Sequence, residues 1–152
     1  MKTTIDLKDF FLTKMSIEEI KGKDLPQVKM SLGLSFGVGV SKNSPNLFKV
    51  TLGVLTHPED SCSGLKIEAS IDGYFELNPE ILNPDEKNFY ILVNGSLILY
   101  GILRGIVANA TGVFRINKFI FPTVMMQEEV KRFFENKDKL NKTKKPKTKE
   151  KK

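Results

Sequence analysis

The chain has 152 residues, one cysteine and one histidine, and its formal net charge is +6. This length fits one ordinary domain that can bury a core without disulfides or metals. A single cysteine excludes an internal disulfide framework and fits a reducing compartment, and the N-terminus has no apolar run of signal-peptide length. We therefore expect one cytoplasmic domain that needs no metal and no cofactor.

The positive charge is concentrated at the C-terminus. Residues 131–152 hold 11 of the 24 basic and 3 of the 18 acidic residues, so residues 1–130 carry 13 basic and 15 acidic residues, a net charge of −2. The lysine-rich end has too few apolar residues to form a core. We expect a domain at 1–136 and a disordered tail at 137–152. Solubility is the simpler interpretation of the tail; a salt-sensitive attraction to RNA, ribosomes or anionic lipid is the alternative.

The first half of the chain alternates apolar and polar residues, which is typical of strands with one buried face. Every even position from Val28 to Val40 is apolar, for example. Turn-forming residues between the runs favour antiparallel neighbours. The first run is irregular near Phe10 and Phe11, where two large apolar residues are adjacent. Four strands are predicted, at 5–20, 28–40, 48–54 and 65–77.

The second half predicts two helices joined by an extended connector. A long helix is expected at 86–109, capped by Asn83 or Asp85 and ended near Gly112. An alternating connector at 115–126 leads to a short amphipathic helix at 127–136. Strands followed by helices predict an α+β fold, namely a four-stranded antiparallel sheet packed with one long and one short C-terminal helix.

The long helix is apolar on nearly every side. A helix that lies on one sheet needs an apolar stripe of only about 100°. Its apolar residues cannot all face one partner: Ile91, Leu92, Val93, Leu97, Ile98, Leu99, Tyr100, Ile102, Leu103, Ile106 and Val107. We infer that other copies of the chain cover the second side.

This helix is also the candidate for a membrane span. Asn94, Gly95 and Ser96 interrupt the apolar run and Arg104 ends it, so it is shorter than the roughly 20 apolar residues that a span needs. No membrane span is expected. In a soluble oligomer, the Gly101 and Gly105 spacing allows two helix backbones to approach closely.

The order of four long strands, a long helix, a proline-containing connector and a closing helix resembles the SecB family of protein-export chaperones. The likeness spans roughly residues 5–135. It is carried by FFLTKMSIEE (10–19), LKIEASIDGYFEL (65–77), YGILRGIVANATG (100–112) and INKFIFPTVMM (116–126).

The resemblance implies a homotetramer, a dimer of dimers that binds unfolded or preprotein polypeptides in apolar grooves for protein export. It also implies a partner, the translocation motor ATPase, on the outer sheet face at Glu19, Lys66 and Glu68. Lys66 and Met15 depart from the family's pattern there, as does the basic tail. One branch of the family serves as dedicated chaperones of toxin–antitoxin systems. That role stays open, as does a basic-tailed adaptor that binds RNA or ribosomes, although no specific nucleic-acid motif is present.

A binder of many polypeptides needs a large, adaptable apolar surface, which Met and Phe side chains supply. We predict that the second strand forms the floor of a client-binding groove with Leu32, Leu34 and Phe36. The connector and the last helix form its wall: Phe119, Phe121, Val124, Met125, Met126, Phe133 and Phe134. The alternative is that these side chains close the core. Whether a strand edge also pairs with the client backbone is not decided by the pattern.

Catalysis is disfavoured by the residues available. Cys62 and His57 share a loop, but no orienting group or oxyanion site accompanies them. The remaining polar candidates alternate along strands or helix faces as a solvated surface does: Glu68, Asp72, Glu76, Arg104 and Arg115. They form no paired carboxylate, triad or phosphate-binding loop. We expect a protein that is not an enzyme.

Overall fold

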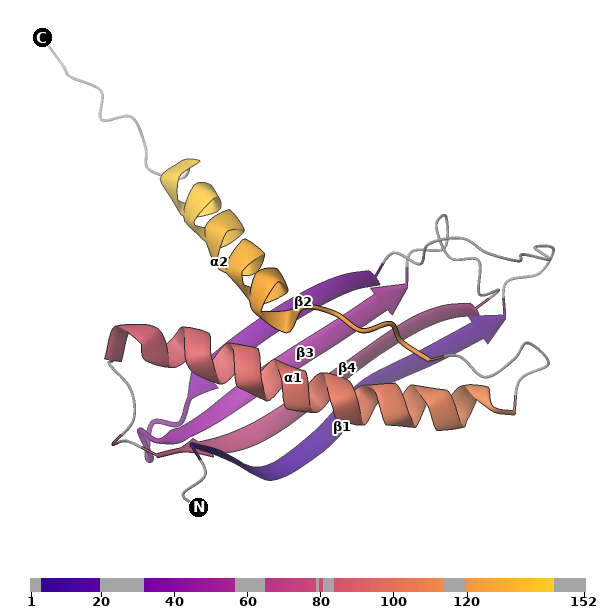
Figure 1. Cartoon of the computed structure of the whole chain (residues 1–152), viewed down its shortest axis with the longest axis horizontal. Helices are drawn as coiled ribbons and strands as arrows, with labels where there is room; N and C mark the ends of the chain where they lie inside the picture. Colours follow the sequence, from indigo (N-terminus) through magenta and orange to yellow (C-terminus); the bar gives the residue numbers. More distant parts are fainter. Residues whose placement is uncertain are drawn as a thin grey trace, which may run out of the picture.

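The computed structural model describes residues 4–19, 32–56, 65–78, 80, 84–113 and 120–143. The elements follow in the order β1 (Ile5–Glu19), β2 (Leu32–Val40), β3 (Leu47–Thr56), β4 (Leu65–Leu77), α1 (Pro84–Thr111) and α2 (Met126–Thr143). The strands form one antiparallel sheet with the order β1-β4-β3-β2. Helix α1 lies along one face of this sheet, and α2 begins near β2 and projects away from it (Figure 1). The predicted α+β fold is confirmed.

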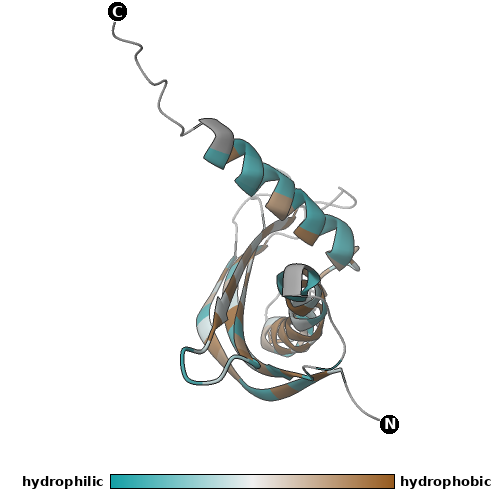
Figure 2. Cartoon of the chain, turned by 90° about the vertical axis from the view of Figure 1, so that its left-hand side faces the viewer, coloured by the Kyte–Doolittle hydropathy of each residue, from teal (hydrophilic) through white to brown (hydrophobic). Residues whose placement is uncertain are grey.

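Alternation along each strand determines which side chains face α1. In β4 the apolar positions are buried, whereas Lys66 and Glu76 are exposed on the other face. The register aligns these faces across the sheet, because Ile71 lies opposite Leu52 in β3 and opposite Leu12 in β1. The sheet curves around α1 (Figure 2), so the helix buries the apolar face and leaves the outer face to solvent.

Two glycines mark the place where α1 lies closest to the sheet. A Cβ atom at Gly73 in β4 would lie 2.7 Å from Cδ2 of Leu99 and 2.7 Å from Cε2 of Phe75. A Cβ atom at Gly95 in α1 would lie 2.9 Å from Cγ2 of Val50. Glycine in the interior of a strand or helix is otherwise unfavourable. Here it allows the two backbones to approach without a void.

Edge strand β1 is irregular, as its sequence predicted. Its register with β4 shifts twice, between Leu7 and Asp9 and between Leu12 and Lys14. Such bulges insert an extra residue and rotate the side chains that follow. The outer face consequently receives Phe11, whose ring meets Tyr74 edge-on with centroids 6.1 Å apart.

Within the described residues, the element boundaries lie within two residues of the predictions except at α2; β3, for example, spans Leu47–Thr56 and was predicted at 48–54. Strand β4 has the predicted ends, and α1 extends slightly beyond 86–109 at both ends. Residues 28–31 and the side chains of Asn83 and Asp85 lie outside the described residues. Helix α2 continues to Thr143 rather than ending at Asn136, because the Lys and Leu residues after Asn136 favour helix whether or not they are buried. The predicted disorder of 144–152 also lies outside the described residues and stays a prediction.

Ser96 is a polar side chain in the apolar layer between α1 and the sheet. It is fully buried, and its Oγ has no hydrogen-bond partner among the described residues. A buried hydroxyl without a partner costs desolvation energy, and alanine is the better helix former. We expect Ser96→Ala to raise the free energy of unfolding by about 1 kcal/mol. Urea unfolding followed by circular dichroism measures this, and a lower midpoint would mean that the hydroxyl is bonded in the assembled protein.

Candidate functional site

An open groove lined by both apolar and polar side chains lies between β2 and the first turns of α2. Phe36 of β2 meets Phe133 of α2 edge-on, with ring centroids 5.7 Å apart. The cavity beside this pair has a volume of about 240 Å³. Its lining is completed by Leu34 and by a polar rim of Glu129, Arg132 and Asn136. Apolar side chains from two elements thus meet at the surface.

The groove is connected to the core through a row of aromatic rings. Phe133 contacts Phe134 with centroids 5.6 Å apart, and Phe134 contacts Phe89 of α1 at 6.1 Å. Phe133 and Phe134 are both half-buried and pack against the core. Leu32, at the start of β2, is half-buried as well. Of these three predicted site residues, Phe133 lines the groove, and all three pack against the core.

Two residues predicted to line the groove lie in the core instead. Phe121 is 0% exposed and Met126 is 3% exposed. The Phe121 ring stacks on Tyr100 of α1 at 5.9 Å with an interplanar angle of 19°. In this arrangement both residues hold the connector against α1 and offer no surface to a client. For these two, the alternative that they close the core is the correct one.

The accessible part of the connector consists of other side chains. Met125 is 67% exposed, Ile120 is 52% exposed and Val124 is half-buried. Ile120 was not predicted to line the groove, although alternation placed it and Phe121 on opposite faces of the connector. Met125 and Val124 stay candidates for the groove wall. Phe119 lies outside the described residues.

A hydrogen bond fixes the connector to the helix. The Tyr100 hydroxyl donates to the carbonyl oxygen of Pro122 at 2.7 Å. Burial raises the pKa of Tyr100 to about 12, against a small opposing influence of Arg104. The hydroxyl therefore keeps its proton, and its donor role, throughout the physiological pH range.

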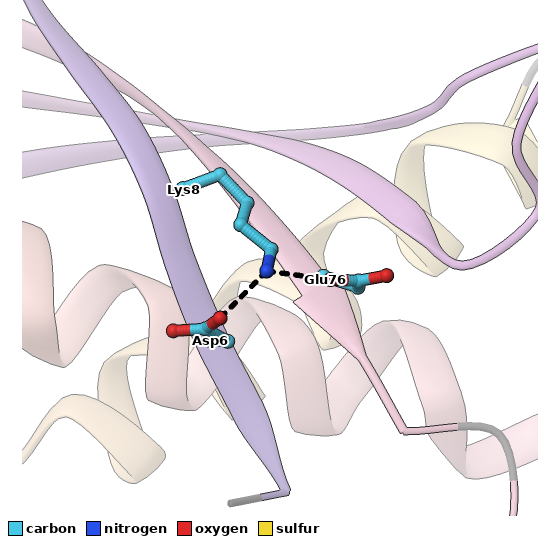
Figure 3. A network of polar contacts seen from close by, with 3 residues as sticks. All are labelled: Asp6, Lys8 and Glu76. Carbon is cyan, nitrogen blue, oxygen red and sulfur yellow. Dashed lines mark hydrogen bonds and ion pairs between the residues drawn. The ribbon is translucent and has the colours of Figure 1, made fainter.

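The outer sheet face carries paired charges rather than an open acidic surface. Lys14 contacts Glu68 at 2.6 Å. Lys8 lies between Asp6 and Glu76, at 2.7 Å from each (Figure 3). Hydrogen bonds to these two carboxylates raise the pKa of Lys8 above its ordinary value. An acidic patch for a partner is thus largely neutralised by lysines from β1.

A third pair on the same face joins Lys49 to Asp72 at 2.7 Å. Burial alone would raise the pKa of Asp72, but hydrogen bonds from Lys49 and Thr51 outweigh it and hold the pKa below its ordinary value. The hydrogen bond to Asp72 raises the pKa of Lys49 in turn. The pair therefore keeps its charges at neutral pH.

The residues predicted to contact a motor ATPase are only partly placed on this face. Lys66 is exposed there and Glu68 is half-buried, while the side chain of Glu19 lies outside the described residues. The resemblance to the SecB family placed Met15 on the outer face, and that was wrong. It lies opposite Ala69 and packs against the core, because the second bulge of β1 reverses the faces of the residues after it.

The residues considered for catalysis and metal binding lie only partly within the described part of the chain. Within them, no group of three His, Cys, Asp or Glu side chains is close enough to hold a metal ion. Cys62, His57 and Arg115 lie outside the described residues. Asp72, Glu68 and Glu76 sit in ion pairs on the outer face, and Arg104 lies on α1.

Comparison with known proteins identifies the class of this fold. In a comparison with solved structures, 11 chains match this fold. One is the SecB-like chaperone of Mycobacterium tuberculosis in complex with a ChAD peptide from the HigA1 antitoxin. It superposes with a TM-score of 0.63 at 14% identity, covering 80% of this chain and 91% of that one. The chain therefore has a SecB-like fold.

Another match is a protein of unknown function from Streptococcus agalactiae. Its TM-score is 0.46 at 10% identity, covering 78% of this chain and 97% of that one. No family model matches the sequence, and no curated protein matches it.

One helix is long and apolar enough to cross a membrane by length and composition alone. It comprises Glu86–Thr111 of α1, so the interruptions at Asn94 to Ser96 do not lower its hydropathy below that of a span. The core helix of a soluble protein passes the same test. Because α1 covers the apolar face of the sheet, its composition has a second explanation within the fold.

Proposed function

We propose that this chain is a non-enzymatic chaperone that holds unfolded polypeptide segments in the groove between β2 and α2. The observation that carries the proposal is the meeting of Phe36 and Phe133 beside an open cavity. A groove with apolar side chains and a polar rim suits segments that expose apolar residues before they fold. The SecB-like fold supports the proposal, because the M. tuberculosis chaperone of this fold was solved with a peptide bound.

The proposed clients are preproteins kept unfolded for export from the cytoplasm. The proposed partner is the translocation motor ATPase, which would approach the outer face near Lys66 and Glu68. A second candidate function is that of a dedicated chaperone in a toxin–antitoxin system. It is favoured by the antitoxin peptide in the M. tuberculosis complex. A general chaperone suppresses aggregation of several unrelated unfolded proteins, whereas a dedicated one acts on its own partner.

We also propose that copies associate through the free face of α1 into a homotetramer. Leu97 is 53% exposed on this face, although it is a large apolar residue. Gly101 and Gly105 are exposed as well, and no described atom lies within 4 Å of a Cβ atom built at either. Surface glycines weaken an isolated helix, and a closely packed partner helix explains them. If another copy covers α1, the apolar composition of this helix does not require a lipid bilayer around it.

The contribution of the connector to client binding is tested by removing its accessible apolar side chains. We expect the double variant Ile120→Ser/Met125→Ser to bind an unfolded reporter about thirty-fold more weakly, because each of the two lost apolar contacts contributes about 1 kcal/mol. Binding is measured by fluorescence anisotropy and, independently, by suppression of reporter aggregation. Both residues are exposed, so the variant should fold normally.

The matched control is Phe11→Ser, which removes an exposed apolar side chain from the outer face of the sheet. It should leave reporter binding unchanged. If the double variant binds as the original chain does, the connector is not part of the site. If the original chain neither binds the reporter nor suppresses its aggregation, the proposed function is wrong.

A further inference from the structure

The side of α1 that faces away from the sheet is divided into a half with large side chains and a half with small ones. The sheet curves around the other side of the helix and leaves this one uncovered (Figure 2). An α-helix turns by about 100° per residue, so residues three or four positions apart lie on the same side. The three residues in the first half of α1 are large and the three in the second half are small: Tyr90, Val93, Leu97, Gly101, Gly105 and Ala108. All six are exposed or half-buried.

Two polar side chains lie on the same side of α1. Asn94 is half-buried, and its Nδ2 donates to the carbonyl oxygen of Tyr90 at 2.9 Å. Arg104 is half-buried as well, and it is the one charged residue after Lys87 in α1. It makes no hydrogen bond or ion pair with a described residue. A guanidinium has five N–H donors, and unpaired donors are unfavourable where water is partly excluded. Its acceptor is therefore expected outside the described part of the chain.

This side of the helix is complementary to itself when a second α1 runs in the opposite direction. In a contact with two-fold symmetry, residue i meets residue j and residue j meets residue i. If the symmetry axis passes at the level of Leu99, residues equally far before and after Leu99 meet. Each large residue then meets a small one, and the two polar residues meet each other: Leu97 with Gly101, Val93 with Gly105, Tyr90 with Ala108, and Asn94 with Arg104.

A parallel pair of helices has no such complementarity. Each residue would meet its own copy, so Leu97 would face Leu97 while the glycines would leave a gap. The two Arg104 guanidinium groups would also face each other, and like charges repel strongly where water is excluded. Helix axes normally lie about 8–10 Å apart, and an approach at the short end of this range needs a small residue opposite each large one. The antiparallel pair meets this condition.

We infer that two α1 helices pack antiparallel in this register, and that Arg104 of each copy donates a hydrogen bond to the Asn94 side-chain oxygen of the other. The free face of α1 is thus occupied by a second copy of this chain. A polar residue in a helix–helix contact often determines orientation and register. This packing rests on the proposed self-association, and it adds the orientation, the register and one polar contact.

Disulfide formation tests the orientation in the full chain. All variants also carry Cys62→Ser, so that only the introduced cysteines react. The variant Val93→Cys/Gly105→Cys should form disulfide-linked dimers under mild oxidation, because the two positions meet across the contact. Neither single variant should form them, because two copies of the same position lie about 18 Å apart along the antiparallel helices. A disulfide needs Cα atoms within about 7 Å. Electrophoresis without reductant measures the yield.

Exchange of the two polar residues tests the contact between them. Arg104→Asn should weaken self-association about a hundred-fold, because a hydrogen bond to a charged group contributes about ten-fold and the two-fold contact contains it twice. Asn94→Arg should weaken it too, since two guanidinium groups then meet. The double variant Asn94→Arg/Arg104→Asn should recover to within about three-fold of the original chain. Within one helix the two positions lie about 15 Å apart, so this recovery requires a contact between copies.

Light scattering over a series of concentrations measures these association constants. Asn109→Arg is the matched control, because it adds the same charge at an exposed position on another side of α1. It should leave the association constant unchanged.

Disulfide-linked dimers of each single-cysteine variant would indicate parallel helices and overturn the orientation. An oligomeric chain whose double-cysteine variant forms no disulfide would overturn the register. Failure of the exchanged variant to recover would overturn the contact between Arg104 and Asn94. These three results leave the proposed chaperone function in place, because suppression of reporter aggregation is measured separately. A monomeric original chain would contradict the proposed self-association itself, and the packing with it.

Discussion

Valine in place of Gly73 should destabilise the fold by about 3 kcal/mol. Even the first carbon of the new side chain would lie 2.7 Å from Leu99 of α1 and 2.7 Å from the ring of Phe75. Both neighbours are fully buried, so neither can move away without disturbing the layer between helix and sheet. Chemical unfolding followed by circular dichroism measures the loss, and the midpoint should fall strongly or the protein should not fold.

Gly39→Val is the matched control for this prediction. Gly39 is also a strand glycine, but no described atom lies within 4 Å of a Cβ atom at its position. Valine favours strands over glycine, so this variant should be as stable as the original chain or slightly more stable. If the two variants lose similar amounts of stability, the close approach of α1 at Gly73 is not what makes glycine necessary there.

A charge on the free face of α1 should dissociate the proposed tetramer. Leu97→Glu places a carboxylate where we expect another helix to pack, and burying an unpaired charge costs several kcal/mol. Size-exclusion chromatography with light scattering should show the mass fall from four chains to one or two. The substitution lies on an exposed position, so the sheet and α1 should keep their secondary structure.

Gly101→Leu separates steric exclusion from charge. Leucine is the better helix former, and within one copy the new side chain points into open space. The isolated helix is strengthened while close contact with a second helix is blocked, so dissociation of this variant cannot be attributed to unfolding. Lys66→Glu on the outer face is the control and should keep the mass of the original chain. Unchanged masses for both α1 variants would exclude this face as the contact.

The fold was predictable because its strands have one solvent-facing side and one buried side. In β4 every apolar residue from Leu65 to Leu77 alternates with a polar one, and the burial follows that alternation residue by residue. Such a pattern determines both the length of a strand and its orientation. The helix α1 was predictable from its length and apolar composition, although the pattern did not identify Gly73 and Gly95 as the points of closest approach.

The groove was predicted less well, because alternation separates two faces without stating which of them is buried. In the connector it correctly divided Ile120 from Phe121, but the aromatic residue turned out to face α1 and the aliphatic one solvent. The predicted face of Met15 was wrong for another reason. A bulge shifts the alternation of faces along the strand by one residue, and it leaves no clear signal in the sequence. Helix α2 is longer than predicted. Its helix propensity continues beyond the last residue that packs against the core, so the end of the amphipathic pattern did not mark the end of the helix.

The bond between Tyr100 and Pro122 has a consequence for cooperativity. Tyr100 belongs to the helix whose free face we expect other copies to cover, and through its hydroxyl and its stacked ring it holds the connector that leads to α2. These two contacts would couple a movement of the helix to the connector. If self-association moves the helix, then self-association and client binding are thermodynamically coupled. A client that strengthens self-association must itself bind more tightly to the associated form, and by the same factor.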